Sequence, residues 1–313
     1  MKEPKVHILM STYNGHKYLR EQLDSIFKQT YNNFTLYVRD DGSNDGTNEL
    51  LEEYIKEHQL GEDKVIIVKN KEKKNLGWKG NFWELLDKCP DADYYAFCDQ
   101  DDVWQPCKLE YAVEMLEKNK NQDLPVMYFS SYDYCDENLR VLHSAPVPPK
   151  SIKLRQVMFY TPALGFSIVI NHKLREIALK TLDRTNLAHD GWVQKIAAAM
   201  GIIIYDSRRT ALYRRYSSAV TSGNKNIFSI VKCWIKDEIF GKVMKNEFHF
   251  SNSRFYQEYQ KYLSADDCKM LHLFAMKKNN IGLWFSRLFY MKRFRPTWSG
   301  ELALRICLFL NRY

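Results

Sequence analysis

The sequence lacks the glycine-rich turns that hold phosphate groups in many nucleotide-binding proteins. Among its 313 residues we find no GxxxxGK followed by Ser or Thr, and no GxGxxG pattern after a predicted strand. Any bound phosphate must therefore be held by other groups, and a metal ion is one way to hold it. An N-terminal glycine-rich GxGxR-like signature is also missing, which disfavours a nucleotidyltransferase.

Paired cysteines and long apolar runs are missing as well. The seven cysteines form no CxxC pair and no Cys/His cluster with zinc spacing. Because the N-terminus carries no signal-peptide pattern, we expect reduced thiols in a cytoplasmic protein. The longest apolar runs, 283–290 and 302–310, each contain an arginine and are shorter than the about 20 apolar residues that cross a bilayer. We therefore expect no transmembrane helix.

Excess positive charge is missing from the first 224 residues. The chain has 46 Lys and Arg against 38 Asp and Glu, and residues 225–313 hold 16 of these bases and 7 of these acids. The first 224 residues therefore hold 30 bases against 31 acids, and the net charge of +8 comes from the C-terminal segment. A basic, aromatic segment can face nucleic acid or an anionic membrane surface, or it can be a solvated helical face.

The first 100 residues show an alternation of strand and helix patterns. Apolar runs predict strands at 6–11, 35–39, 65–69 and 94–98, and later at 127–131, 167–170 and 202–205. Helical spacing of apolar residues lies between the early strands, and it returns from about 190 to 200. This alternation indicates a parallel sheet covered by helices on both faces. Only helical patterns occur beyond 222, so we place a boundary near 217–226, between domains at 1–222 and 223–313.

Polar clusters follow three of the predicted strands. They are Ser-Thr-Tyr-Asn-Gly at 11–15, Asp-Asp-Gly-Ser at 40–43 and Asp-Gln-Asp-Asp at 99–102. Ligands of open α/β sheets bind at the carboxyl ends of the strands, so three such clusters at one sheet edge predict a binding crevice. Each cluster taken alone is also typical of turn and helix-capping residues.

The cluster at 99–102 contains three acids, which repel one another unless a cation lies between them. Oxygen ligands suit Mg²⁺ or Mn²⁺, which take one or two carboxylates and add the phosphates of a substrate. In the structural alternative, Asp99 ends the strand and Asp102 caps the helix that carries Lys108. Both interpretations leave Asp101 for the metal.

The motifs HILMSTYNG (7–15), YVRDDGSNDGT (37–47), YYAFCDQDDVW (94–104) and NLAHDGW (186–192) closely resemble those of glycosyltransferase family 2. The segments FCDQDDVW (97–104), HDGW (189–192) and YRRYSSAV (213–220) look most like bacterial rhamnosyltransferases of cell-wall and capsular polysaccharide synthesis. The resemblance covers about residues 5–222. It implies an α/β protein with the GT-A nucleotide-sugar fold, a Rossmann-like, mixed and mainly parallel sheet, with a helical C-terminal extension.

The resemblance also implies roles for individual residues. The donor-binding residues are Ser11, Tyr13, Asp41, Asn81, Asp99 and Gln100. Asp101 is the ligand of Mn²⁺ or Mg²⁺ at the donor diphosphate, and Asp190 is the catalytic base. From spacing alone, Asp190 is equally well a helix N-cap, because a helical pattern begins there.

The implied reaction is an inverting transfer of a sugar to an acceptor hydroxyl. The resemblance points to dTDP-L-rhamnose as the donor, with a UDP-hexose such as UDP-galactose or UDP-glucose as the alternative. A lipid-linked or growing polysaccharide is the implied acceptor, and nucleic acid is not an implied partner. A catalytically inactive nucleotide-binding subunit of a polysaccharide assembly complex is the competing class of function.

Two positions depart from the family pattern. Tyr216 stands where related enzymes often carry a histidine near the metal, so Arg214 or Arg215 could contact phosphate instead, or both could be surface charges. Gly191 stands where relatives carry an aromatic residue, which predicts a more open acceptor pocket.

The C-terminal segment has three amphipathic stretches, at 227–240, 270–278 and 281–295. Basic, aromatic helices can lie in a membrane interface, where each Lys or Arg contributes about 1 kcal/mol near anionic lipid. We therefore expect peripheral contact with the inner face of a bacterial cell membrane. The competing interpretation is a helical subdomain that packs on the catalytic domain or forms a homodimer.

Overall fold

A computed structural model describes residues 3–70, 74–121, 123–215, 247–276 and 280–312, which form two compact units. The first comprises Met1–Val147, Ala163–Ala197 and Gly201–Ala219, and the second comprises Pro148–Pro162, Ala198–Met200 and Val220–Tyr313. The boundary predicted near 217–226 and the amphipathic stretch at 227–240 lie outside the described residues.

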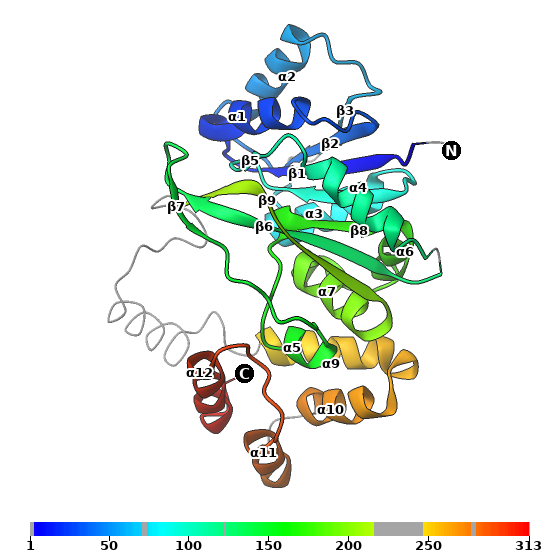
Figure 1. The fold of residues 1–313 in the computed structure, drawn as a ribbon, viewed down its shortest axis with the longest axis vertical. Coiled ribbons are helices and arrows are strands. Elements are labelled where there is room, and N and C mark those ends of the chain that lie inside the picture. Colours follow the sequence, from blue (N-terminus) through cyan, green and yellow to red (C-terminus); the bar gives the residue numbers. More distant parts are fainter. Residues whose placement is uncertain (1–2, 71–73, 122, 216–246, 277–279, 313) are drawn as a thin grey trace. The chain divides into compact units, whose positions relative to one another are not determined.

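The first unit is built on one sheet of nine strands (Figure 1). The strands are β1 (Val6–Thr12), β2 (Phe34–Asp40), β3 (Val65–Ile67), β4 (Tyr94–Cys98), β5 (Val103–Trp104), β6 (Val126–Cys135), β7 (Val141–Ser144), β8 (Ile168–Asn171) and β9 (Ile202–Arg214). Their order is β3-β2-β1-β4-β8-β6-β9-β5, and β7 pairs with β6. Strands β3, β2, β1 and β4 are mutually parallel, whereas β8 runs antiparallel to its neighbours β4 and β6.

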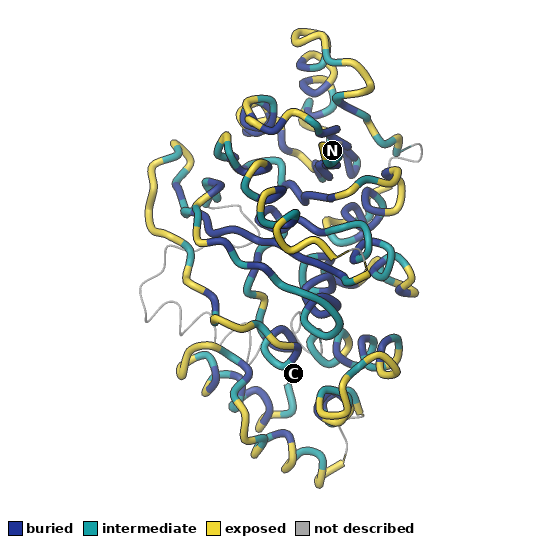
Figure 2. Tube along the Cα trace, turned by 45° about the vertical axis from the view of Figure 1, so that its right-hand side comes forward, coloured by how far each residue is buried: buried dark blue, intermediate teal, exposed yellow. Residues whose placement is uncertain are grey.

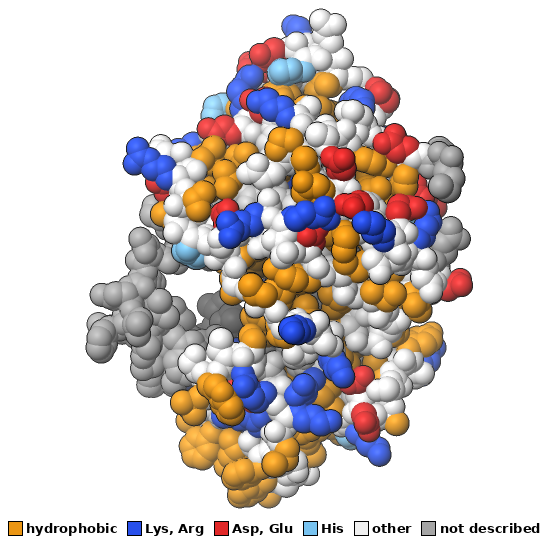
Figure 3. Space-filling model, viewed as in Figure 1, with side chains coloured by type: hydrophobic (Ala, Val, Ile, Leu, Met, Phe, Trp, Pro, Cys, Tyr) orange, Lys and Arg blue, Asp and Glu red, His pale blue; other side chains and the backbone are white. Residues whose placement is uncertain are grey.

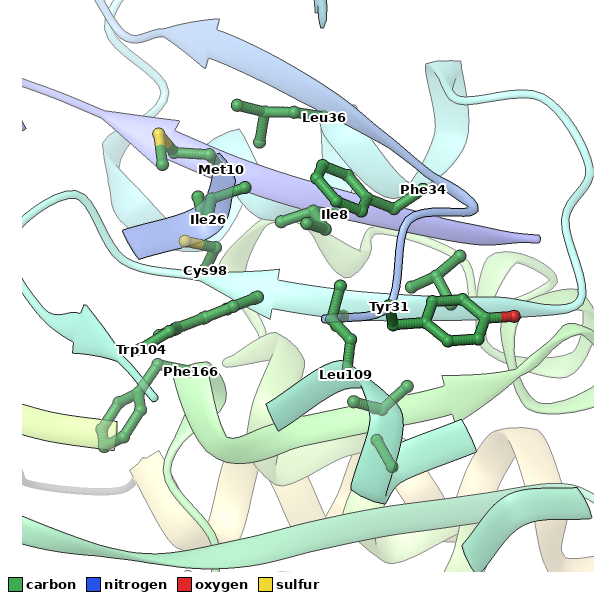
Figure 4. Close-up of a cluster of buried hydrophobic side chains, with 14 of the residues drawn as sticks. Ile8, Met10, Ile26, Tyr31, Phe34, Leu36, Cys98, Trp104, Leu109 and Phe166 are labelled. Atoms are coloured by element: carbon green, nitrogen blue, oxygen red, sulfur yellow. The ribbon is translucent and has the colours of Figure 1, made fainter. Parts of the chain in front are cut away.

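Helices follow the strands of this sheet as the alternating pattern predicts. They are α1 (His16–Phe27), α2 (Thr47–Glu57), α3 (Gly77–Lys88), α4 (Lys108–Lys118), α6 (His172–Leu179) and α7 (His189–Met200). Every residue of β2 and β4 is buried, which explains why parallel strands covered on both faces read as continuous apolar runs (Figure 2). Figure 4 shows the core between these layers, with Ile8 and Met10 of β1 among the side chains of α1, α4 and the neighbouring strands.

Strand β9 is longer than the segment 202–205 that the sequence predicts. It continues to Arg214 because it pairs with β6 along its length and with β5 near its end. Residues 206–214 mix buried, partly exposed and exposed positions and include several polar side chains, so they lack the continuous apolar run that marks the shorter prediction. This extension carries Arg214 to the loop that follows β4.

The second unit is helical. Its helices are α5 (Leu154–Val157), α9 (Glu247–Tyr259), α10 (Ala265–Ala275), α11 (Ile281–Leu288) and α12 (Trp298–Phe309). Phe159, Phe274 and Phe294 form its aromatic centre, with ring centroids 5.0–5.3 Å apart. Across the described part of the chain, none of the helices has the length and apolar content to cross a membrane.

The amphipathic stretch predicted at 281–295 is a helix only in its first half. Helix α11 ends at Leu288, and Arg305 of α12 donates to the carbonyl oxygens of Arg287, Leu288 and Tyr290 at 2.8–3.2 Å. The guanidinium thereby satisfies carbonyl groups that a continuing helix would have bonded internally. A partner far along the chain therefore sets the end of this helix.

Candidate active site

The three predicted polar clusters meet at one edge of the sheet. Strands β2, β1 and β4 are adjacent and parallel, so the segments after them leave the sheet side by side. Thr12 donates its hydroxyl to Asp40 at 3.0 Å, and the backbone N–H of Asp41 donates to the Thr12 carbonyl at 2.8 Å. The prediction of a shared edge is thus confirmed.

Gln100 ties the loop after β4 to the loop after β1. Its side-chain oxygen accepts the backbone N–H of Tyr13 at 2.8 Å, and its amide nitrogen donates to the Tyr13 carbonyl at 3.0 Å. A Cβ atom at Gly15 would lie 2.2 Å from the same side-chain oxygen, so a larger residue there would displace the Gln100 amide. The side chain of Tyr13 is 50% exposed, so its ring is available to a ligand.

Four polar side chains form a hydrogen-bonded network at the same edge. Ser11, Asn81 and Asp41 are predicted site residues, and Arg39 is not. Asn81 of α3 donates to the Ser11 hydroxyl at 2.6 Å and to the Arg39 carbonyl at 3.0 Å. Arg39 of β2 donates to Asn81 at 2.5 Å and pairs with Asp41 at 2.8 Å. Arg39 is not among the predicted site residues, although an arginine next to the apolar residues of β2 is a signal that it has a buried partner.

Asp41 is held within this network. Its carboxylate also accepts the backbone N–H of Leu76 at 2.8 and 3.0 Å, and the residue is only 2% exposed. The carboxylate therefore anchors the segment before α3. Its contact with a nucleoside, like the donor-binding roles of Ser11, Tyr13 and Asn81, stays a prediction.

Arg39→Met should lower the free energy of unfolding by about 3 kcal/mol, because it leaves Asp41 as a buried charge without its cation. Urea unfolding followed by circular dichroism measures the change. The matched control is Arg20→Met, which removes an exposed pair with Glu57 and should barely move the unfolding midpoint. Equal midpoints for the two variants would contradict a structural role for the buried pair.

Three carboxylates come together where the sequence predicts the metal and the base. Burial, followed by the negative charges of Asp101 and Asp190, raises the pKa of Asp99 to about 7. Asp190 is 89 residues further along the chain than Asp101, so the fold brings it to the Asp-Gln-Asp-Asp loop. The predicted metal ligand and the predicted base thus belong to one electrostatic cluster.

Asp190 lies in the first turn of α7, but it does not cap that helix. The N-cap residue is Ala188, so the interpretation of Asp190 as an N-cap is wrong. One carboxylate oxygen of Asp190 accepts the backbone N–H of Gly191 at 2.7 Å. The helix N-terminus favours a negative charge at this position, which suits a base that must be ionised to accept a proton.

His189 anchors the start of α7. Its ring lies 4.0 Å from that of Phe82 and 4.6 Å from that of Phe97, and the residue is 3% exposed. Burial lowers the pKa of His189 to about 3, so the ring is neutral. A Cβ atom at Gly165 would lie 3.0 Å from its Nε2 atom, so a small residue is needed beside it. The neutral ring packs Asp190 into place without adding a charge.

Arg214 occupies a position that neither sequence interpretation anticipates. Its side chain is fully buried, its Nε atom donates to the Asp101 carbonyl at 2.9 Å, and it pairs with Glu21 of α1. The guanidinium also lies 4.3 Å from the centre of the Tyr18 ring. Phosphate contact and a surface location are therefore both wrong for Arg214. Tyr216 lies outside the described residues.

Asp102 joins the same loop to the end of β9. It is fully buried and accepts the backbone N–H of Arg214 at 3.2 Å. Burial, together with the charges of Asp101 and Asp99, raises the pKa of Asp102. Helix α4 begins at Lys108 with Cys107 as its N-cap, so the interpretation of Asp102 as its cap is wrong.

The acids suit a divalent cation that is completed by a substrate. Within the described ranges, no group of three His, Cys, Asp or Glu side chains forms a ready metal cage. Mg²⁺ and Mn²⁺ sites commonly use one or two carboxylates and take the remaining oxygens from phosphates and water. Burial raises the pKa of Asp99 most, and repulsion from Asp101 and Asp190 raises it further; a cation would relieve that repulsion, so the residues present fit such a site.

The fold is the GT-A fold of glycosyltransferases. The structure of residues 1–349 of S. aureus TarS in complex with UDP-GlcNAc is similar, with a TM-score of 0.59 and 16% identity over 97% of this chain and 81% of that one. A Pyrobaculum calidifontis mannosyltransferase in complex with GDP-Man and Mn²⁺ has a TM-score of 0.50 and 16% identity, covering 98% and 75%. At such identities the likeness shows the fold alone.

The sequence comparisons then identify the family. The model described as Glycosyl transferase family 2 matches residues 7–169, and the chain belongs to that family. An uncharacterized glycosyltransferase of Methanocaldococcus jannaschii is 33% identical over 161 residues, covering 51% of this chain and 52% of the relative. The putative glycosyltransferase EpsE of Bacillus subtilis is 32% identical over 149 residues, covering 46% and 50%. The chain spans about half the length of these two curated relatives.

A third relative matches over more of its length. It is the dTDP-rhamnosyl transferase RfbG of Shigella flexneri, which is 26% identical over 226 residues, covering 69% of this chain and 74% of the relative. This match is longer than the segment 7–169 that the family model matches.

Proposed function

We propose that this chain is an inverting, metal-dependent glycosyltransferase that moves a sugar from a nucleotide-sugar donor to an acceptor hydroxyl. The observation that carries the proposal is that Asp99 lies near enough to Asp101 and Asp190 for their negative charges to raise its pKa, at the carboxyl edge of the sheet. We assign Asp101 to the metal, Asp190 to the base and the Ser11–Asn81–Arg39–Asp41 network to the donor side. Residues 1–222 would form the catalytic domain, and 223–313 a helical region.

In the proposed reaction, the ionised Asp190 accepts the proton of the acceptor hydroxyl as that oxygen attacks the anomeric carbon. Attack from the face opposite the leaving group inverts the anomeric configuration, and the nucleoside diphosphate leaves with the bonding electron pair. A bound Mn²⁺ or Mg²⁺ would supply positive charge to the leaving diphosphate. Asp101 would hold that ion, and Gln100 keeps the loop of Asp101 attached to the loop after β1.

We infer that the donor is dTDP-L-rhamnose. Support comes from the motifs at 97–104, 189–192 and 213–220 and from the similarity to the Shigella flexneri dTDP-rhamnosyl transferase. A UDP-hexose is the alternative donor. The acceptor would be a lipid-linked or growing polysaccharide, reached from the cytoplasmic face of the membrane. The helical region at 223–313 would contact that membrane face, and formation of a homodimer is the competing role of this region.

A thermal-shift panel of nucleotide-sugars, each with Mn²⁺ and with chelator, tests this proposal. The cognate donor should raise the melting temperature by mass action, and the rise should need the metal. Hydrolysis of that donor in Mn²⁺ separates an enzyme from an inactive nucleotide-binding subunit. A panel without any shift, together with no hydrolysis, would sink the proposed activity.

Arg214 is a positioning residue in this scheme, because it holds the backbone of Asp101 and does not reach a substrate. Arg214→Met should raise the Mn²⁺ concentration needed for half-maximal donor hydrolysis by about tenfold or more, since partners of metal ligands contribute about 10–100-fold to affinity. A manganese titration measures this, and saturating metal should restore part of the rate.

The matched control for Arg214 is Arg209→Met on the same strand. Arg209 is 59% exposed and pairs with Asp133 at 3.4 Å, so its loss should leave the manganese dependence unchanged. If Arg214→Met lowered the rate equally at all manganese concentrations, Arg214 would not act through the metal site. Circular dichroism of both variants identifies any loss of folded protein.

A further inference from the structure

Helices α11 and α12 expose an unusual number of large apolar side chains. Those exposed on the two helices and the segments beside them are Ile281, Phe285, Phe289, Met291, Trp298, Leu302, Phe309 and Leu310. Met291 is 95% exposed, and Ile281 and Trp298 are 77% and 76% exposed. Figure 3 shows hydrophobic side chains gathered over these helices, at the bottom of the view. Contiguous apolar surface of this kind marks an interaction site.

The exposed side chains form stripes on helices that are otherwise packed. Ile281, Phe285 and Phe289 are four residues apart along α11 and just beyond it, so they share one face. Trp298 and Leu302 have the same spacing on α12, whose Leu304 and Leu308 are buried. The Trp284 indole donates to the Phe309 carbonyl at 3.1 Å and so joins the two helices. We call these exposed side chains the α11–α12 apolar face.

Within residues 280–312 the charges are almost all positive, although Asp266 and Asp267 of α10 lie near Tyr290. Residues 280–312 contain six Lys and Arg and one acid, Glu301. Glu301 is 5% exposed and pairs with Arg305 at 2.7 Å, so it presents little negative charge to solvent. Arg287 and Arg305 are bound to helix-end carbonyls. Lys292 is exposed, and Arg293, Arg295 and Arg312 are partly exposed, although Arg293 and Arg295 also donate to carbonyl oxygens. A cationic rim around an apolar face complements anionic lipid headgroups.

We propose that the α11–α12 apolar face inserts into the headgroup region of a bilayer that contains anionic lipid. This proposal rests on the proposed function, in which the acceptor is reached from the membrane face, and it names the surface that binds the membrane and the main driving force of that binding. Aromatic and aliphatic side chains enter the interface, and the rim cations add attraction to the lipid charge. Several of the arginines are bound within the protein, so fewer charges attract lipid than the sequence contains. Burial of apolar surface therefore contributes the larger part of the binding free energy.

Flotation of the full chain with vesicles tests this proposal. We expect flotation with phosphatidylcholine mixed with phosphatidylglycerol, weaker flotation with phosphatidylcholine alone, and partial retention at high salt, because salt screens only the charged part. The double variant Met291→Ser/Trp298→Ser should reduce vesicle partitioning at least about tenfold. The matched control, Val141→Ser/Val147→Ser, removes apolar residues that are 57% and 79% exposed elsewhere and should float like the parent chain.

Other outcomes would overturn the proposal. One is that the parent chain floats with neither vesicle, and another is that the parent and the double variant float equally. A third is that the parent chain and the control sediment as dimers while the double variant sediments as a monomer. Circular dichroism checks that the double variant folds. Donor hydrolysis in solution is measured in parallel, so a loss of membrane binding with intact hydrolysis separates failure of this surface from failure of the proposed enzyme.

Discussion

Asp190→Asn should lower the rate of sugar transfer by about 10²–10⁴-fold and leave donor binding within about twofold of the parent chain. The amide has the shape of the carboxylate but cannot take the proton of the acceptor hydroxyl. The hydrogen bond from the Gly191 N–H to the side-chain oxygen can be kept by the amide oxygen, so the start of α7 should be undisturbed. Transfer to acceptor and calorimetric titration with donor give the two quantities.

The control for this result is Asp183→Asn, an exposed acid shortly before α7. Its backbone has positive φ, a conformation that asparagine tolerates, so the variant should fold and transfer sugar normally. Transfer by Asp190→Asn at a rate near that of Asp183→Asn would remove Asp190 from the role of base. A loss of donor binding in Asp190→Asn would instead show that Asp190 acts on the donor side.

The parallel half of the sheet is predictable because the burial of its strands follows from the apolar residues of each strand alone. Strands β1, β2 and β4 are buried on both faces, so each appears in the sequence as an apolar run followed by polar residues. The chain order of those runs then places the polar residues at one edge. The grouping of the clusters at 11–15, 40–43 and 99–102 follows from this local information alone.

The supports of the site are not predictable in this way, because their partners lie far along the chain. Arg214 is separated from Asp101 by 113 residues, and Asn81 from Ser11 by 70. Nothing near Arg214 in the sequence distinguishes a buried guanidinium from an exposed one, since Arg215 stands beside it. The same limit applies to α11, which ends where Arg305 supplies donors for its carbonyl groups.

The acids of the candidate site fall into two kinds, those near other negative charges and those paired within the protein. Asp99 carries a raised pKa, whereas Asp41 is paired with Arg39 and bonded to a backbone N–H. Acids whose pKa is raised by burial and by neighbouring negative charges are typical of a functional site. This contrast separates Asp99 from Asp41, whose carboxylate helps to hold the fold.

Asp101→Ala should lower metal-dependent transfer by about 10²-fold or more and abolish the response of the melting temperature to Mn²⁺ and donor together. The change removes the carboxylate proposed to hold the ion at the donor diphosphate. It also removes one of the two negative charges that raise the pKa of Asp99, so the protein without metal should stay folded. Transfer and thermal shift are measured across a manganese titration, with a chelator arm for each protein.

The control for Asp101 is Asp93→Ala, an exposed acid at the other end of β4 whose carboxylate accepts the N–H of Lys5 at 2.7 Å. It should keep the metal response and the rate of the parent chain, because it lies away from the carboxyl edge of the sheet. If Asp101→Ala transferred sugar as well as Asp93→Ala, and chelator changed neither, the acids after β4 would not hold a catalytic metal. Catalysis would then depend on Asp190 and the donor network alone.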